Sequence, residues 1–285
     1  MPLRFIAAFA AGMTTVASLA DTPRTIVPLA PHQAIYELRL ADRTDDIASA
    51  DGRIAMALKS ETCGVYKLDY RFVARFQQEQ EITQTDQQTV STENVAGTEF
   101  DFSTKTFVDG TAEKEVVGEA RQDGNATKVV MTEPEERSFA LPLSRFPMQH
   151  TRELIEKAKA GQQIVEARLF DGDDDSEKLL TSTAIISAHE PAAATPEAAK
   201  PEDAAAAARQ ALQAGIRSAL AGLRSWRVSE AYYNSDSDPD GLPVFRTSYV
   251  LYENGVSDEL KLDFGDYVFA GSLSKLDLLD LPKCP

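Results

Sequence analysis

The chain has 285 residues, and its 45 acidic and 29 basic side chains give a formal net charge of −16 at pH 7. A surface this acidic repels phosphate backbones, which argues against nucleic-acid binding, and an acidic membrane leaflet does not attract it. The length is sufficient for a substantial hydrophobic core. After the N-terminus no apolar run reaches the roughly 18 residues of a membrane span, so we expect a soluble mature chain without a transmembrane segment.

Residues 1–20 have the composition of a secretory signal peptide. Arg4 forms a short basic region, residues 5–19 form an apolar region, and Ser18 and Ala20 are the small residues that signal peptidase needs. We therefore expect cleavage after about Ala20 and export to the periplasm. Asp21 stands where a lipoprotein has its lipid-modified cysteine, so no lipid anchor is expected.

Apolar and polar residues alternate along much of the mature chain, which is typical of strands with one buried face. The clearest case is residues 66–76, where Tyr70 and Phe72 share one face while Lys67 and Asp69 share the other. The same pattern predicts further strands at residues 34–40, 54–58, 100–102, 245–251 and 260–264. The apolar faces must close on one another, in a strongly curved antiparallel sheet, a barrel or a sandwich.

Turn residues separate several of these strands. Asn254 and Gly255, between Tyr252 and Val256, are typical of a two-residue hairpin turn. Residues 239–241 also predict a turn, with glycine at the position that needs a positive φ. Both turns favour antiparallel neighbours over crossover helices.

Residues 147–160 have helical periodicity instead, and Gly161 suits the left-handed position that ends a helix. The predicted helix has four side chains on one face: Thr151, Leu154, Ile155 and Ala158. A short amphipathic helix of this kind can plug the open end of a curved sheet.

A stretch rich in alanine, proline and glutamate at about residues 190–203 is predicted to be a flexible insertion, because it cannot bury enough apolar surface to fold. An Ala-rich helix is predicted directly after it, beginning near Pro201. Its apolar side consists of Leu212, Ile216, Leu220 and Leu223.

The chain has two cysteines, Cys63 and Cys284, near the two ends of the mature sequence. Paired thiols persist as a disulfide in an oxidising compartment, so we expect one disulfide between them. The alternative is two unpaired thiols, which are a liability outside the cytosol. A redox-active pair is disfavoured, because the Cys-x-x-Cys spacing is absent.

Several motifs along the chain resemble those of the cell-envelope integrity protein EipB family. They are Pro31-His32 followed by Ala34, Tyr36 and Leu38, then Cys63-Gly64, Phe170-Asp171-Gly172, Asp240-Gly241-Leu242-Pro243, Leu251-Tyr252-Glu253-Asn254-Gly255 and Cys284-Pro285. The resemblance covers nearly the whole mature chain, although the segment at about residues 190–210 is not part of it.

The resemblance implies a periplasmic protein with a mainly β fold. That fold is one large, strongly curved antiparallel sheet, a β-spiral or open barrel similar to periplasmic lipoprotein carriers, with one or two short helices. It implies a disulfide between Cys63 and Cys284, a role in cell-envelope integrity and no enzyme activity. We therefore expect residues 21–285 to form a single β-rich domain that contains the flexible insertion.

Patterns associated with catalysis or metal binding are incomplete. Ser272 and Lys275 have the Ser-x-x-Lys spacing of penicillin-binding proteins, but they lie in a predicted strand and the companion motifs are missing. The acidic runs at residues 171–175 and 236–240 lack the closing glutamate of an EF-hand loop. The three histidines, at positions 32, 150 and 189, are too scattered for a predicted zinc site. We expect no catalytic residues, metal or cofactor.

The aromatic row Tyr66, Tyr70, Phe72 and Phe76 has two interpretations: ordinary core, or the wall of a cavity for an acyl chain or a peptide. Our first hypothesis is a non-enzymatic periplasmic protein that binds a hydrophobic or lipid ligand, or a protein partner, on a concave β surface. The second is a soluble carrier of lipid or lipoprotein, which needs an open apolar interior. The third is an envelope hydrolase, which needs a serine, a histidine and a carboxylate in one cleft.

Overall fold

The structure is a computed structural model that describes residues 28–41, 47–60, 62–78, 81–172, 177–190, 203–234 and 241–282. These ranges contain fourteen strands and two helices. In chain order they are β1 (His32–Leu40), β2 (Ser49–Lys59), β3 (Val65–Gln77), β4 (Ile82–Asn94), β5 (Glu99–Val108), β6 (Thr111–Asp123), β7 (Ala126–Glu133), β8 (Arg137–Pro142), α1 (Pro147–Lys159), β9 (Ile164–Leu169), β10 (Leu180–Ala188), α2 (Ala204–Leu220), β11 (Ser225–Tyr233), β12 (Phe245–Tyr252), β13 (Ser257–Asp263) and β14 (Val268–Leu278).

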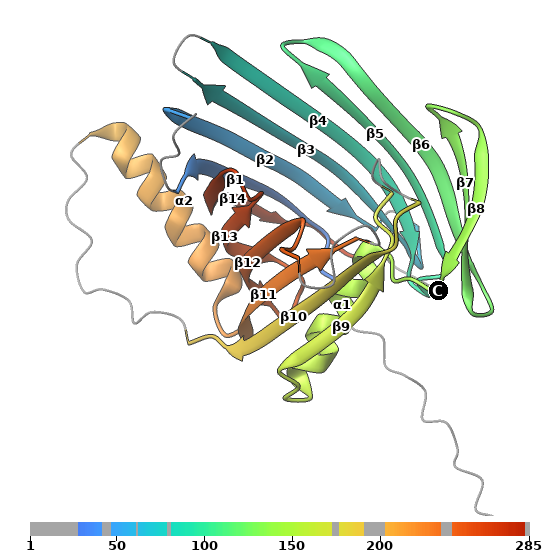
Figure 1. The fold of residues 1–285 in the computed structure, drawn as a ribbon. Helices are drawn as coiled ribbons and strands as arrows, with labels where there is room; N and C mark the ends of the chain where they lie inside the picture. Colours follow the sequence, from blue (N-terminus) through green and yellow to red (C-terminus); the bar gives the residue numbers. More distant parts are fainter. Residues whose placement is uncertain are drawn as a thin grey trace, which may run out of the picture.

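All fourteen strands belong to one antiparallel sheet, in the order β8-β7-β6-β5-β4-β3-β2-β1-β14-β13-β12-β11-β10-β9. The first and last strands are therefore neighbours in its middle. Figure 1 shows how the sheet curls, so that β9 to β13 face the long strands β2 to β6. Its two ends meet next to Arg145, whose amide donates to the Arg168 carbonyl at 2.7 Å and whose carbonyl accepts from the Phe170 amide at 2.9 Å. The sheet is thus nearly closed into a barrel, which confirms the predicted fold class.

Strand alternation places one set of side chains inside this barrel. The predicted strand at residues 66–76 is β3, where Tyr66 and Ala74 are buried and Arg71 and Arg75 are exposed. The Arg71 guanidinium lies 2.7 Å from the Asp86 carboxylate of β4 on the outer face. A hairpin is also present at Asn254 and Gly255, where Gly255 has a φ of 90°. Its loop has three residues and not the two predicted, because the Tyr252 amide donates to the Val256 carbonyl.

Side chains fill much of the interior. Three hydrophobic clusters lie there: one around α1, one around β1, β14 and α2, and one that contains Phe100, Phe102, Phe146 and Phe170. The rings of Phe100 and Phe146 are stacked with their centroids 5.3 Å apart. The interior is therefore largely packed with side chains, unlike the open apolar interior that the carrier hypothesis needs.

Helix α1 confirms the helix predicted at residues 147–160. Its Leu154, Ile155 and Ala158 pack against inward-facing residues of β2, β3 and β9 to β12, so the helix lies inside the curved sheet. The Gln162 amide donates to the Lys157 carbonyl at 2.9 Å, and Gly161 has a φ of 76°. Glycine therefore ends this helix in the left-handed conformation, as its position in the sequence predicts.

Helix α2 confirms the second predicted helix and begins after Asp203, whose carboxylate accepts from the Ala206 amide at 2.7 Å. Ile216 and Leu220 are buried, but Leu212 is 49% exposed. A hollow of about 580 Å³ lies between β14 and the part of the helix from Ala208 to Ile216. Leu212, on the predicted apolar side, is therefore only partly covered.

Several predictions fall outside the described residues: the signal peptide, the insertion at residues 191–202, the acidic turn at 235–240 and Cys284. Ser272 and Lys275 lie within β14, where Ser274 occupies an irregularity in the pairing with β1. The strand interpretation of the Ser-x-x-Lys sequence is thus confirmed. Within the described part of the chain, no helix is both long enough and apolar enough to cross a membrane.

Candidate functional site: an apolar interior cavity

A cavity of about 260 Å³ lies inside the sheet, between the inner faces of β1, β2, β3, β12 and β13 and the first turns of α1. Its apolar wall consists of Leu29, Ile54, Met56, Leu58, Met148, Leu251 and Leu260. Its polar wall consists of His32, Tyr36, Tyr70, Thr151, Tyr249 and Ser257. No Asp, Glu, Lys or Arg lines it in the described part of the chain. An apolar pocket with a few hydrogen-bonding groups is the usual form of a small-molecule site.

Most of the polar groups on this wall are already hydrogen-bonded. The Tyr36 hydroxyl donates to the Ser257 carbonyl at 2.8 Å, and the Thr151 hydroxyl donates to the Pro147 carbonyl at 3.0 Å. The His32 Nδ1 atom lies 2.8 Å from the Ala30 carbonyl oxygen. Burial lowers the pKa of His32 and raises the pKa of Tyr70 to about 12, so both side chains are uncharged at neutral pH.

A buried glutamate holds the N-terminus of α1 beside the cavity. Glu93 of β4 is 2% exposed, and its two carboxylate oxygens accept from the amides of Met148 at 2.7 Å and Gln149 at 2.6 Å. Arg152 lies 3.7 Å from the same carboxylate and donates to the Val95 carbonyl. Burial raises the pKa of Glu93 to about 7, against the opposing effects of the two amides and Arg152. Glu93 thus satisfies amides that the first turn of a helix leaves free.

A second buried glutamate holds α1 from the opposite wall. Glu230 of β11 is 3% exposed, and its carboxylate lies 2.8 Å from His150 Nε2 of α1. The same carboxylate accepts from the hydroxyls of Tyr249 at 2.8 Å and Tyr232 at 3.1 Å. Burial alone would raise the pKa of Glu230, but the hydrogen bonds from His150, Tyr249 and Tyr232 outweigh it and lower the pKa. His150 is therefore a packed, hydrogen-bonded residue.

Replacing Glu230 with glutamine is expected to lower the free energy of unfolding by about 1–3 kcal/mol at neutral pH, because His150 and two tyrosines lose a charged acceptor. The pKa of Glu230 is lower in the folded protein than its ordinary value of 4.5, so its contribution is present above pH 4.5 and is lost as the pH falls through the folded pKa. Denaturant titrations over a pH series measure both effects. We expect the difference between the two proteins to shrink in acid, and a constant difference would contradict this assignment.

The four aromatic residues of the predicted ligand wall have different surroundings. Tyr70 lines the cavity. Tyr66 is 5% exposed, and its hydroxyl accepts from the Leu29 amide at 3.0 Å. Phe72 and Phe76 pack against Phe269 with ring centroids 6.3 and 5.9 Å apart. The structure thus brings Tyr70 to the cavity and places the two phenylalanines in a hydrophobic cluster. Glu93 and Glu230, which position α1, were not found from the sequence.

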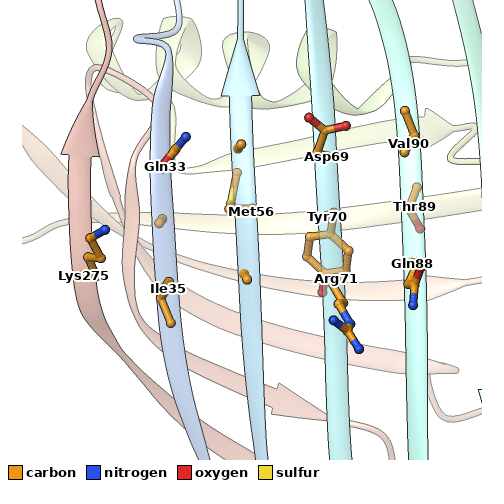
Figure 2. Close-up of a pocket in the computed structure, with 13 residues that line it drawn as sticks. Gln33, Ile35, Met56, Asp69, Tyr70, Arg71, Gln88, Thr89, Val90 and Lys275 are labelled. Atoms are coloured by element: carbon orange, nitrogen blue, oxygen red, sulfur yellow. The ribbon is translucent and has the colours of Figure 1, made fainter. Parts of the chain in front are cut away.

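A second hollow, of about 410 Å³, lies over the strands β1 to β4 and β14 (Figure 2). It forms because two small residues of β2 have larger cross-strand neighbours: Ala55 lies opposite Ile35 and Arg71, and Ala57 lies opposite Gln33 and Asp69. These residues alternate with the inward-facing side chains, so this hollow belongs to the outer face. Met56 and Tyr70 border both hollows. A binding experiment must therefore distinguish the outer hollow from the interior cavity.

The histidines do not complete a hydrolase site in the residues that the structure describes. His189 Nδ1 lies 3.0 Å from the Ser225 hydroxyl, and His150 pairs with Glu230. No hydrogen bond among the described residues joins a serine, a histidine and a carboxylate into one group. The described part also contains no group of three or more His, Cys, Asp or Glu side chains that could hold a metal ion. The cavity is thus a mainly apolar hollow with a few polar side chains on its wall.

Comparisons with known proteins agree with this architecture. Residues 23–280 match the model of the EipB-like family. The chain is 33% identical over 276 residues to the cell envelope integrity protein EipB of Brucella abortus (strain 2308), which covers 96% of this chain and 91% of that protein. It is also similar to the crystal structure of a beta-barrel-like protein of domain of unknown function DUF1849 from Brucella abortus. That match has a TM-score of 0.74 and 34% identity, and it covers 89% of this chain and all of the other. The chain belongs to the EipB-like family.

Proposed function

We propose that this chain is an exported, non-enzymatic periplasmic protein that maintains the integrity of the cell envelope by holding an apolar ligand in its interior cavity. The envelope role is supported by the name of the Brucella abortus relative, and export is supported by the composition of residues 1–20. The observation that carries the binding function is the cavity itself, which is apolar, uncharged and bordered by a helix held in place by two buried glutamates.

The size of the cavity favours a small apolar molecule over a large lipid cargo. Its volume of about 260 Å³ is just below the roughly 300–1,000 Å³ of pockets that enclose drug-sized ligands. A single acyl chain or an apolar side chain of a partner suits this volume, and a lipoprotein with several chains does not. We therefore favour ligand retention over bulk lipid transport.

The experiment is a titration of the purified protein with the fluorescent apolar probe N-phenyl-1-naphthylamine. We expect saturable binding that weakens about tenfold in Leu260→Phe, because the larger side chain fills the interior cavity. The matched control is Ala55→Leu, which fills the outer hollow and is expected to bind like the wild type. Failure of the wild-type protein to bind the probe contradicts the proposal, and so does a loss of binding confined to Ala55→Leu.

A further inference from the structure

We infer that the interior cavity takes an uncharged amphiphile whose hydroxyl group hydrogen-bonds to Tyr70 Oη and His32 Nε2, with its apolar tail against the aliphatic wall. This inference rests on the proposed function, since it names the class of ligand for the same cavity. It is carried by two polar atoms that line the cavity and have no partner in the described chain, and by the lack of charged side chains around them.

The first of these atoms is the Tyr70 hydroxyl. Tyr70 faces inward because it lies opposite Met56 of β2 and Thr89 of β4 on the inner side of the sheet. Among the described residues, no hydrogen bond involves its hydroxyl, whereas the hydroxyls of the other cavity tyrosines, Tyr36 and Tyr249, are bonded to the Ser257 carbonyl and to Glu230. Its oxygen is not one of the fully enclosed atoms that lack a partner, so it is open to the cavity. Tyr70 therefore presents a free donor to whatever fills this space.

The second atom is Nε2 of His32. The ring is 2% exposed, and its Nδ1 atom lies 2.8 Å from the Ala30 carbonyl oxygen. A carbonyl oxygen only accepts, so Nδ1 carries the hydrogen, and Nε2 of the neutral ring is an acceptor. Burial lowers the pKa of His32, which keeps the ring neutral. Nε2 has no protein partner among the described residues and is not fully enclosed, so it presents a free acceptor to the cavity.

The polar wall of the cavity thus offers one free donor and one free acceptor, which fit a hydroxyl group, because a hydroxyl accepts one hydrogen bond and donates another. A pure hydrocarbon leaves both groups without a partner after water is displaced, which costs free energy. A hydroxyl that accepts from Tyr70 and donates to His32 satisfies both. The aliphatic side chains of Ile54, Leu58 and Leu251 then contact the tail.

The electrostatics of the cavity disfavour a charged head group. No Lys or Arg of the described chain lines the cavity, so a carboxylate or phosphate has no counter-ion there. Two buried glutamates border it, Glu230 bonded to the cavity residue Tyr249 and Glu93 bonded to the amide of Met148, and both disfavour an anion. A cationic head group lacks a carboxylate on the lining as well. The ligand class is therefore a neutral alcohol, and fatty acids are excluded in their ionised form.

The test compares 1-decanol with decanoate at neutral pH, each measured by displacement of N-phenyl-1-naphthylamine from the wild-type protein. We expect decanol to displace the probe at a concentration about tenfold lower than decanoate, or lower still. The reason is that no group of the cavity compensates for burial of the decanoate charge. Tyr70→Phe removes only the hydroxyl, and we expect it to weaken decanol binding about five- to tenfold, which is more than it weakens binding of the probe, because the probe has no hydroxyl group. The control is Tyr267→Phe, which removes a hydroxyl from a ring that packs against Phe269 outside the cavity lining and is expected to keep the preference for decanol.

Each outcome decides a different claim. If the probe binds but decanoate competes as well as decanol, or if Tyr70→Phe leaves decanol affinity unchanged, the head-group assignment is overturned and the proposed function stands. If the wild-type protein binds neither the probe nor decanol, both are overturned. The decanol and decanoate comparison uses the wild-type protein only, so it remains decisive even if a variant is unstable.

Discussion

Replacing Glu93 with alanine is expected to lower the free energy of unfolding by about 3–5 kcal/mol, the range for removing one partner of a buried charged group. The carboxylate is 2% exposed and accepts from two amides of α1, so its loss leaves those amides without an acceptor and the buried Arg152 without its counter-ion. Alanine cannot replace these contacts, and the space between β4 and α1 is too enclosed for free access of water. Denaturant unfolding measures the loss.

Glu119→Ala is the matched control for this experiment. Glu119 pairs with Arg121 at 3.3 Å, but both side chains are largely exposed, so its removal is expected to cost at most about 1 kcal/mol. Hydrogen exchange gives a second readout, because the amides of Met148 and Gln149 lose their acceptor and are expected to exchange faster in Glu93→Ala. If Glu93→Ala is no less stable than Glu119→Ala, Glu93 does not hold α1 in the way the geometry indicates.

The second large effect is expected for Cys63→Ser, through loss of the proposed disulfide with Cys284. Closing a loop of about 220 residues is worth roughly 5 kcal/mol in the chain-entropy model, less any strain in the folded protein. The pairing is a proposal, because Cys284 lies outside the described residues. It is supported by the register of three neighbouring strands, in which His32 pairs with Leu278 of β14 and with Leu58 of β2. The last described residues and the turn that contains Cys63 thus lie at the same end of adjacent strands.

Thermal unfolding with and without reductant measures the effect of Cys63→Ser. In oxidant, we expect Cys63→Ser, Cys284→Ser and the double variant to be destabilised equally, because each removes the same bond. In reductant, the wild-type protein is expected to unfold at nearly the same temperature as the variants. Additive losses from the two single variants, or an unchanged melting temperature in oxidant, would count against a bond between these two cysteines.

The strands that the sequence reveals are those with one purely apolar face. In β3, each even position from Tyr66 to Phe76 is apolar, so alternation alone identifies both the strand and its buried side. Strand β4 is not identified by alternation, because its inward-facing residues are polar like its outward-facing ones. Among the inward-facing residues are Thr85, Gln87 and Thr89. Its pairing with β3 and β5, and not its own pattern, makes it a strand. Local periodicity therefore predicts the strands whose inward-facing residues are apolar, and it misses strands such as β4, whose inward-facing residues are polar.

The residues that position α1 show a different limit. The helix was predictable from the spacing of Leu154, Ile155 and Ala158, and these side chains are indeed its buried contacts. Glu93 and Glu230 have nothing in their local sequence that distinguishes them from exposed glutamates. Each glutamate is distinguished only by its contact with α1, and these contacts join residues that are distant in the chain. Met148 is 55 positions from Glu93, and His150 is 80 positions from Glu230. Buried polar contacts of this kind are a property of the tertiary fold, so one sequence alone does not reveal them.

The central pairing of β1 with β14 has a consequence for biogenesis. The hydroxyl of Ser274 donates to the carbonyl of Ile35, and these residues are separated by 239 positions. Contacts this distant in the chain form slowly, because a long loop must close before they stabilise anything. The two halves of the sheet cannot be joined until nearly the whole polypeptide has been synthesised and released. Until the last strand is available, the sheet therefore stays in two unjoined halves, and β1 lacks the neighbour that β14 provides on one of its edges.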